Sequence, residues 1–202
     1  LVNLIPRFFD VTEGAVYVDG RDVREVAQYD LRDRIGYIPQ RGVLFSGTVE
    51  SNLRYADENA TAEDLAEALE VSQAAKFVAE MEGKMDAPIS QGGANVSGGQ
   101  KQRLSIARAL MKKPPIYIFD DALSALDFKT DAALRRALNT SAEKSTMLIV
   151  TQRVSTIRHA EQIIVLDDGE VVGKGNHEQL IETCDTYREM VASQLSDRKS
   201  VV

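Results

Sequence analysis

Short apolar runs alternate with amphipathic stretches along this chain. The segments 35–39, 116–119 and 146–151 carry no charged residue and are rich in aliphatic and aromatic side chains. Such runs, separated by helical stretches, are typical of buried strands in a parallel sheet. The pattern therefore predicts an α/β fold with a parallel sheet.

Helical periodicity is found between and beyond these runs. Helices are predicted over four ranges: 61–83, 97–113, 130–139 and from 177 onward. Thr61 is the expected N-cap of the first helix, and Asp64 is the acidic partner of a capping box. Pro114 and Pro115 end the second helix, because proline cannot continue the hydrogen-bond ladder.

Two Asp-Gly dipeptides predict tight turns. The dipeptide at 19–20 follows a strand candidate over 15–18. The dipeptide at 168–169 lies between strand candidates over 163–166 and 170–172. Asp-Gly suits two-residue hairpin turns because both residues tolerate a positive φ.

The composition narrows the class of protein. The chain has 202 residues, with 24 Lys and Arg against 31 Asp and Glu, and a formal net charge of -7. This acidic balance argues against nucleic acid as the main partner. Cys184 is the single cysteine, and no apolar run approaches the roughly 18 residues that span a bilayer. Because a single thiol cannot form a disulfide within the chain, cytosolic surroundings are expected, and no signal peptide opens the chain.

Polar side chains follow two of the predicted strands. Asp120 and Asp121 come directly after the run 116–119, and Gln152 follows the run 146–151. Ligands of open α/β sheets bind beyond the carboxyl ends of the strands. The sequence therefore predicts that these three side chains lie together.

A glycine-rich segment opens the second long helix. It consists of Ser97, Gly98, Gly99 and Gln100. The first amides of a helix have no partner within it, and the helix dipole places positive charge there. Together with a serine hydroxyl they can bind a phosphate, whose close approach glycine allows. The alternative is a plain N-capped helix after a flexible loop, since short motifs also match by chance.

The apolar run 116–119 ends in the carboxylate of Asp120. An acid at the edge of a sheet can hold Mg²⁺, often through water, beside a nucleotide. Its alternative role is to cap the following turn. The glycine-rich segment one helix upstream favours the magnesium role.

Taken in order, these motifs resemble those of the ABC ATPases. Ser97–Gln100 is similar to the signature, Asp120 to the acid of the Walker B motif, and Ser124–Asp127 to the D-loop. Gln40 resembles the glutamine of the Q-loop, and Val150–Thr156 matches the region of the H-loop. The resemblance covers nearly the whole chain.

The resemblance implies a role for each of these residues. Gln40 would contact Mg²⁺ and the attacking water, and Asp120 would hold the shell of the metal. The signature Ser97–Gln100 would bind the γ-phosphate of ATP held mainly by a second nucleotide-binding domain. Ser124 and Asp127 would lie at the interface with that domain.

The resemblance also implies the surroundings of the chain. The segment 43–49 looks like that of multidrug-exporter-type domains, whose Q-loop meets a transmembrane domain. We therefore expect a transmembrane domain fused upstream, ATP and Mg²⁺ as cofactors, and a place on the cytoplasmic face of the cell membrane. The implied parts are a partial ATPase core (1–59), an α-helical subdomain with the signature (60–113) and the rest of the core (114–202).

The phosphate-binding Walker A loop, G-x-x-x-x-G-K-[ST], occurs nowhere in the chain. The chain opens at Leu1 rather than Met, with a segment similar to the one that directly follows this loop in the family. We therefore expect that the loop and the aromatic residue that stacks on adenine have been cut away or are missing. Because the loop's lysine holds the β- and γ-phosphates, the isolated chain is expected to be inactive.

Two further departures fall on catalytic positions of the family. Asp121 stands where the family has Glu, and Gln152 stands where it has His. Aspartate is one methylene shorter, and a misplacement of about 1 Å can cost on the order of 10²-fold in rate. An amide can donate a hydrogen bond but cannot titrate. With Ser97–Gln100 intact, these changes indicate the degenerate half of a heterodimeric exporter, an ATPase by family.

Two other classes of protein stay open. The chain could be a non-catalytic ABC-like scaffold or regulatory domain that has lost the use of ATP. A soluble ABC ATPase of DNA repair or translation is a weaker alternative, because the exporter-like segment 43–49 and the acidic charge argue against it.

Overall fold

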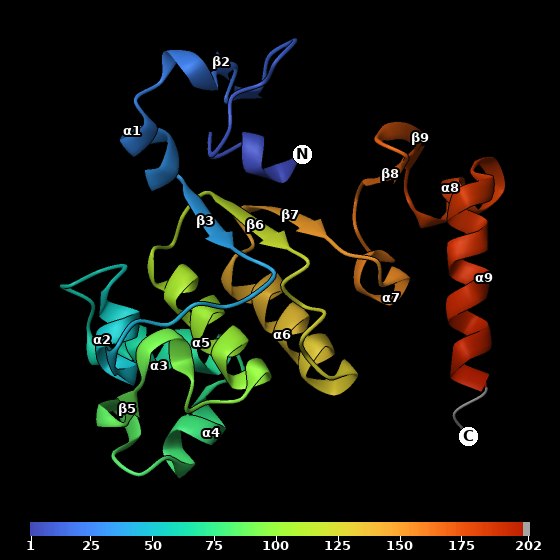
Figure 1. Cartoon of the computed structure of the whole chain (residues 1–202). Coiled ribbons are helices and arrows are strands. Elements are labelled where there is room, and N and C mark those ends of the chain that lie inside the picture. Colours follow the sequence, from blue (N-terminus) through green and yellow to red (C-terminus); the bar gives the residue numbers. More distant parts are fainter. Residues whose placement is uncertain (200–202) are drawn as a thin grey trace. The chain divides into compact units, whose positions relative to one another are not determined.

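The computed structural model describes the backbone of residues 1–199 and the side chains of residues 1–194 (Figure 1). The chain forms two compact units, residues 1–150 and 151–202, and each is described by itself. Within the described residues, no helix combines the length and the apolar character needed to cross a membrane. The division at residues 59 and 113 stays a prediction, and the end of its last part, 200–202, lies outside the described residues.

A three-stranded parallel sheet forms the centre of the first unit. Its strands are β3 (Ile35–Ile38), β6 (Ile116–Asp120) and β7 (Thr146–Val150), with β6 in the middle. Figure 1 shows the three strands side by side. In the register between β3 and β6, Tyr37 lies beside Ile118. The predicted α/β fold with a parallel sheet is confirmed.

β7 is less covered than its sequence suggests. A buried strand is expected over 146–151, but Thr146 and Val150 are exposed and the residues between them are half-buried. β7 is an outer strand, as β3 is, but the segment before β3 packs on Ile35, whereas Leu148 of β7 is only partly buried against the same apolar core. The middle strand β6 has a neighbour on each side and is buried from Tyr117 to Phe119.

The segment before β3 packs on the sheet through a small apolar core. Its elements are η1 (Val2–Leu4), β1 (Tyr17–Val18), β2 (Arg21–Asp22), η2 (Val23–Glu25) and α1 (Gln28–Asp33). β1 and β2 form an antiparallel hairpin around Asp19 and Gly20, which confirms the predicted turn. The buried residues of this core are Val2, Val23, Leu31, Ile35 and Ile118.

A mainly helical segment connects β3 to β6. Its elements are β4 (Gly47–Thr48), α2 (Val49–Arg54), α3 (Ala62–Val71), α4 (Ala75–Glu80), η3 (Lys84–Asp86), β5 (Pro88–Ile89), η4 (Gln91–Gly93) and α5 (Gly98–Met111). The longest of these helices, α5, packs against α2 and α3. The predicted helix over 97–113 is thus confirmed, and it ends before Pro114.

The predicted single helix over 61–83 is wrong, because two helices, α3 and α4, occupy this range. Gln73 between them has a left-handed backbone, with φ at +61°. The amide of Gln73 bonds to the carbonyl of Glu70 at 3.0 Å, and the amide of Ala74 bonds to the carbonyl of Leu69 at 2.7 Å. This pair of bonds is the Schellman motif, which ends a helix. Apolar periodicity resumes in α4, which packs in the same core, so the sequence pattern hides the break.

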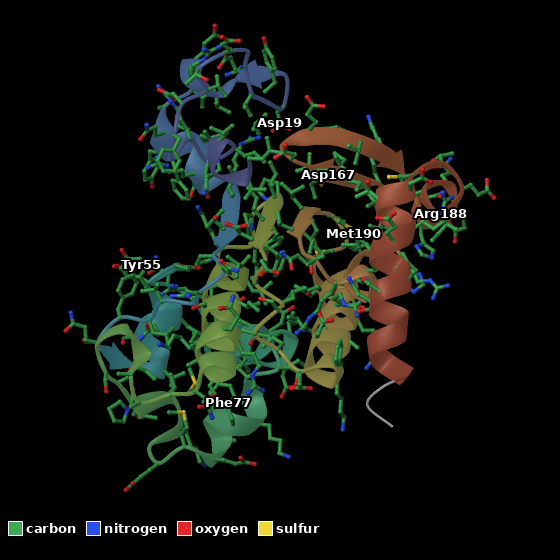
Figure 2. The ribbon with its side chains drawn as sticks, turned by 45° about the vertical axis from the view of Figure 1, so that its right-hand side comes forward. Asp19, Tyr55, Phe77, Asp167, Arg188 and Met190 are labelled. Atoms are coloured by element: carbon green, nitrogen blue, oxygen red, sulfur yellow. The ribbon has the colours of Figure 1, made fainter. Side chains whose placement is uncertain are left out.

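After β6, helix α6 (Phe128–Ser141) leads to β7 and completes the first unit. The elements of the second unit are α7 (Val154–Ile157), β8 (Ile163–Asp167), β9 (Glu170–Gly175), α8 (His177–Thr183) and α9 (Asp185–Lys199). β8 and β9 form the predicted antiparallel hairpin. Figure 2 labels Asp167 at the end of β8, and Arg188 and Met190 on α9.

Candidate functional site

Three predicted site residues gather at the carboxyl ends of β3 and β6. Asp120 is the last residue of β6, Asp121 follows it, and Gln40 lies just beyond β3. The side-chain Nε2 of Gln40 donates a hydrogen bond of 3.0 Å to Oδ2 of Asp121. The parallel pairing of the two strands thus joins residues 81 positions apart.

Asp121 has a left-handed backbone, with φ at +48°. This conformation costs a residue with a Cβ roughly 1–2 kcal/mol, and Asp and Asn tolerate it best. The amide of Asp121 donates to the carbonyl of Val150 at 3.0 Å, and its carbonyl accepts the hydroxyl of Ser124 at 2.7 Å. These bonds hold the turn after β6 and fix the direction in which the carboxylate leaves it.

The carboxylate of Asp120 is bound by a side chain of β3. The hydroxyl of Tyr37 donates to Oδ2 of Asp120 at 2.7 Å and lies 2.8 Å from the amide oxygen of Asn3. Burial, and then the bond to Asp120, raise the pKa of Tyr37, so the hydroxyl stays a donor. Neither Tyr37 nor Asn3 is predicted from the sequence. The contact follows from the register of the strands, in which Tyr37 pairs with Ile118, on the same face as Asp120, and the sequence alone does not give this register.

The oxygen atoms gathered here fit Mg²⁺. This ion takes one or two carboxylates of the protein and completes its shell with water and substrate phosphates. Asp120 offers a carboxylate, and Gln40 keeps its amide oxygen because its nitrogen makes the bond to Asp121. Among the described residues, no group of three or more His, Cys, Asp and Glu side chains could hold a metal. A magnesium ion at this edge would therefore depend on the phosphates of a nucleotide as well.

Ser97 and Gln100 cap the start of α5 reciprocally. The hydroxyl of Ser97 accepts the amide of Gln100 at 3.3 Å, and Oε1 of Gln100 accepts the amide of Ser97 at 2.9 Å. The structure thus contains the N-capped helix that was the alternative to a phosphate site. The two roles are compatible, because a hydroxyl that accepts one bond still has its own proton to donate.

Gly98 and Gly99 leave the backbone at this helix start uncovered. A Cβ added at Gly98 would meet no described atom within 4 Å, and one added at Gly99 would lie 3.6 Å from the carbonyl oxygen of Ala125. Packing within the described part of the chain therefore does not require glycine at Gly98. The bare backbone suits an approaching group from outside this chain.

The two predicted D-loop residues hold the chain's own turns. Asp127 caps α6, where its carboxylate accepts the amides of Thr130 at 2.9 Å and Lys129 at 3.1 Å. The hydrogen bonds from Thr130, the amide first, lower the pKa of Asp127. Ser124 donates to the carbonyl of Asp121 at 2.7 Å. The position of both residues at an interface stays a prediction.

Gln152 belongs to the second unit. Its side chain is exposed, and its carbonyl accepts Nε2 of Gln194 at 2.6 Å. Oε1 of the same Gln194 accepts the amide of Val154 at 2.9 Å, so α9 holds the loop that carries Gln152. Gln194 is not predicted from the sequence. That Gln152 shares a site with Asp120 and Asp121 stays a prediction, because the two units are described separately.

Comparison with known proteins gives the class of the fold and then the family. The structure of a bacterial Atm1-family ABC exporter with ATP bound matches with a TM-score of 0.92 and 36% identity, over 96% of this chain and 34% of that one. The fold is therefore that of the ABC ATPases. The ABC transporter family model matches residues 1–124, and the chain belongs to the ABC transporter family.

Curated relatives agree with this family. An uncharacterized ABC transporter ATP-binding protein of Mycobacterium tuberculosis is 50% identical over 197 residues. A putative multidrug export ATP-binding/permease protein of Staphylococcus aureus is 40% identical over 194 residues. Both alignments cover 96% of this chain, which spans only 34% of each relative. The predicted resemblance to exporter-type nucleotide-binding domains is confirmed.

Proposed function

We propose that this chain is the nucleotide-binding domain of an ABC exporter. It couples the binding and hydrolysis of ATP, at the interface of two such domains, to the transport of a substrate across a membrane. The observation that carries this proposal is the meeting of Gln40, Asp120 and Asp121 at the carboxyl ends of β3 and β6. The similarity to the Atm1-family exporter and to the putative multidrug export protein of Staphylococcus aureus supports it.

The residues at the sheet edge would serve the ATP site of this chain. Mg²⁺, when bound with ATP, neutralises charge on the β- and γ-phosphates. Asp120, oriented by the Tyr37 hydroxyl, would hold the shell of this ion, and the amide oxygen of Gln40 would lie beside it. Asp121 would orient the attacking water, within the limit set by its short side chain and its bond to Gln40.

The signature would serve the ATP site of a second domain. Ser97 keeps its hydroxyl proton, and Gly98 leaves backbone amides uncovered at the positive end of α5. A γ-phosphate from outside this chain can approach these donors closely. Among the described residues, Ser97 and Gln100 make their capping bonds to each other and not to Asp121, so the two sites can differ in rate.

We propose further that the chain is the degenerate half of a heterodimer. Asp121 and Gln152 depart from the family's catalytic pair, while Ser97–Gln100 keeps its cap and its glycines. Slow hydrolysis at the chain's own site, together with a competent signature for the partner, follows from this asymmetry. In this proposal a transmembrane domain fused upstream places the chain at the cytoplasmic face of the cell membrane.

The test uses the complete protein with its transmembrane part. It is purified from its native membranes, the co-purified second chain is identified by mass spectrometry, and ATP hydrolysis is measured in vesicles. We expect a second, different ABC chain and hydrolysis that depends on Mg²⁺. A complex of identical chains contradicts the heterodimer. A complex that neither binds nor hydrolyses ATP contradicts the exporter and supports the scaffold.

A further inference from the structure

Gln102 of α5 binds the backbone of residues 38–46, the Gln40 segment. Gln102 is 1% exposed. Its Oε1 accepts the amide of Gly42 at 2.7 Å, and its Nε2 donates to the carbonyl of Pro39 at 3.0 Å. The two bonds bracket Gln40 on either side. Both polar atoms of this buried amide are therefore spent on the backbone of the Gln40 segment.

The Gln40 segment also lies unusually close to the backbone of α5. A Cβ added at Gly42 would lie 2.7 Å from Oγ of Ser105 and 3.0 Å from the carbonyl oxygen of Lys101. The first contact is shorter than a real Cβ makes and the second is tighter than most, so a side chain at Gly42 requires its neighbours to move. The close approach brings the amide of Gly42 within reach of Gln102.

A second side chain continues the attachment nearly two turns further along α5. Nη2 of Arg108 donates to the carbonyl of Val43 at 2.7 Å, and its guanidinium lies 4.9 Å from the ring centre of Phe45. The ring of Phe45 lies 4.6 Å from that of Tyr55, which Figure 2 labels. Burial lowers the pKa of Arg108, whose guanidinium nonetheless stays charged. Residues 102, 105 and 108 share one helix face by their spacing.

We propose that Gln102 is a positioning residue that holds the Gln40 segment and the signature as one rigid body. The signature Ser97–Gln100 opens the same helix, and an α-helix transmits a displacement along its axis with little bending. This inference rests on the proposed function, in which Gln40 serves the chain's own ATP site and the signature serves the partner's. Gln102 then links the two ATP sites, so that a shift of the Gln40 segment at one site moves the signature at the other.

The competing explanation is that Gln102 merely satisfies two backbone groups and stabilises the domain. Two variants of the complete transporter, studied with its partner chain, separate these roles. Gln102→Met keeps the length of the side chain and removes both hydrogen bonds. Ser105→Ala is the matched control, because the Ser105 hydroxyl is buried on the same helix face without a hydrogen-bond partner among the described residues.

The measurement is hydrogen exchange of the segments 38–46 and 96–104, with and without Mg·ATP, together with steady-state kinetics. In the wild type and in Ser105→Ala we expect Mg·ATP to slow exchange in both segments. In Gln102→Met we expect segment 38–46 to exchange about tenfold faster without nucleotide, because the Gly42 amide loses its acceptor. We also expect that in this variant Mg·ATP no longer slows exchange of the two segments together, so that segments 38–46 and 96–104 respond to different extents. We also expect kcat to fall about tenfold while KM for ATP changes less than about threefold.

The variant Gly42→Ala tests the same attachment from the other side, since its Cβ must push the segment away from α5. It is expected to reproduce the uncoupled exchange and the fall in kcat. Wild-type exchange and kinetics in Gln102→Met overturn the proposal. Two other results assign Gln102 a structural role only and also overturn the proposal. One is unfolding of both variants, and the other is a fall in kcat accompanied by a rise in KM of similar size. If Mg·ATP changes neither segment in the wild type, the proposed function fails, while the faster exchange without nucleotide still decides whether Gln102 holds the segment.

Discussion

The side-chain amide of Gln40 donates a hydrogen bond of 3.0 Å to the carboxylate of Asp121. The two residues follow neighbouring parallel strands, so the bond spans the edge of the sheet. This bond holds the carboxylate of Asp121, which is shorter than the family's glutamate, against Gln40 of the same chain. A glutamate at the same turn would place its carboxylate one methylene further from the backbone.

The first prediction is that restoring the family's catalytic residues raises hydrolysis at this site. The change is Asp121→Glu combined with Gln152→His in the proposed heterodimer, with hydrolysis at the second site disabled. The longer acid reaches further, and the imidazole can titrate near neutral pH. We expect the rate to rise about tenfold or more. Phosphate release under saturating Mg·ATP is the measurement.

Asp30→Glu is the matched control for the added methylene, since Asp30 is exposed on α1. It is expected to leave the rate unchanged. An unchanged rate in the double variant as well would mean that the residues at these two positions do not limit hydrolysis, and the degenerate half would lose its main support.

The second prediction separates capping from phosphate binding at Ser97. Two capping boxes are compared: Ser97 with Gln100 on α5, and Thr61 with Asp64 on α3, which confirms the predicted box. Ser97→Ala and Thr61→Ala are each expected to lower the free energy of unfolding by about 1 kcal/mol, because each removes a helix cap. Urea denaturation followed by circular dichroism measures this loss.

Only Ser97→Ala is expected to affect hydrolysis, and it should do so at the partner's ATP site. The loss of one phosphate donor there is expected to cost on the order of 10²-fold in rate. Equal effects of the two variants on hydrolysis would show that Ser97 acts through helix stability alone.

The third prediction concerns the 202-residue chain as printed, which contains no Walker A sequence. We expect calorimetric titration with Mg·ATP to show no binding in the micromolar range, because the loop's amides and lysine supply most of the hold on the phosphates. The complete protein, titrated in parallel, is expected to bind. Micromolar binding by the 202-residue chain would show that the residues at the sheet edge suffice to hold ATP.

The strands and the long helix α5 could be predicted because their causes are local. Uncharged apolar runs predict β3 and β6, and a proline pair ends α5. The break at Gln73 could not be predicted, since a left-handed glutamine is set by the packing of α4 rather than by local preference. Exposure of β7 likewise depends on which segments of the chain pack against it, which apolar content does not encode.

The candidate site shows the same division between local and long-range causes. The order of the motifs along the chain predicts Gln40, Asp120 and Ser97 as site residues. Metal and phosphate binding need particular residue types at the end of a strand or the start of a helix, and such positions can be found in the sequence. The supporting residues Tyr37 and Gln102 depend on the register between strands and on the approach of a loop to a helix. Both contacts join residues more than 12 positions apart, where sequence periodicity carries no information.

The last prediction uses the buried tyrosine of the middle strand. Burial raises the pKa of Tyr117 to about 12, against about 10 in an unfolded chain. Above pH 10 the unfolded chain therefore loses the phenolic proton while the folded chain keeps it. The contribution of Tyr117 to stability is complete below pH 10 and is lost as the pH rises toward 12.

Tyr117→Phe keeps the ring beside Phe119 and removes this titration. We expect the stability of the wild type to fall more steeply than that of the variant between about pH 10 and pH 12, with the difference growing by about 1 kcal/mol per pH unit. Urea unfolding at intervals of pH measures it. Tyr29→Phe is the control, because Tyr29 is 81% exposed and should follow the wild type. Parallel curves for wild type and Tyr117→Phe would mean that the Tyr117 hydroxyl is hydrated in the folded chain, and the strand would then be more open to water than its packing indicates.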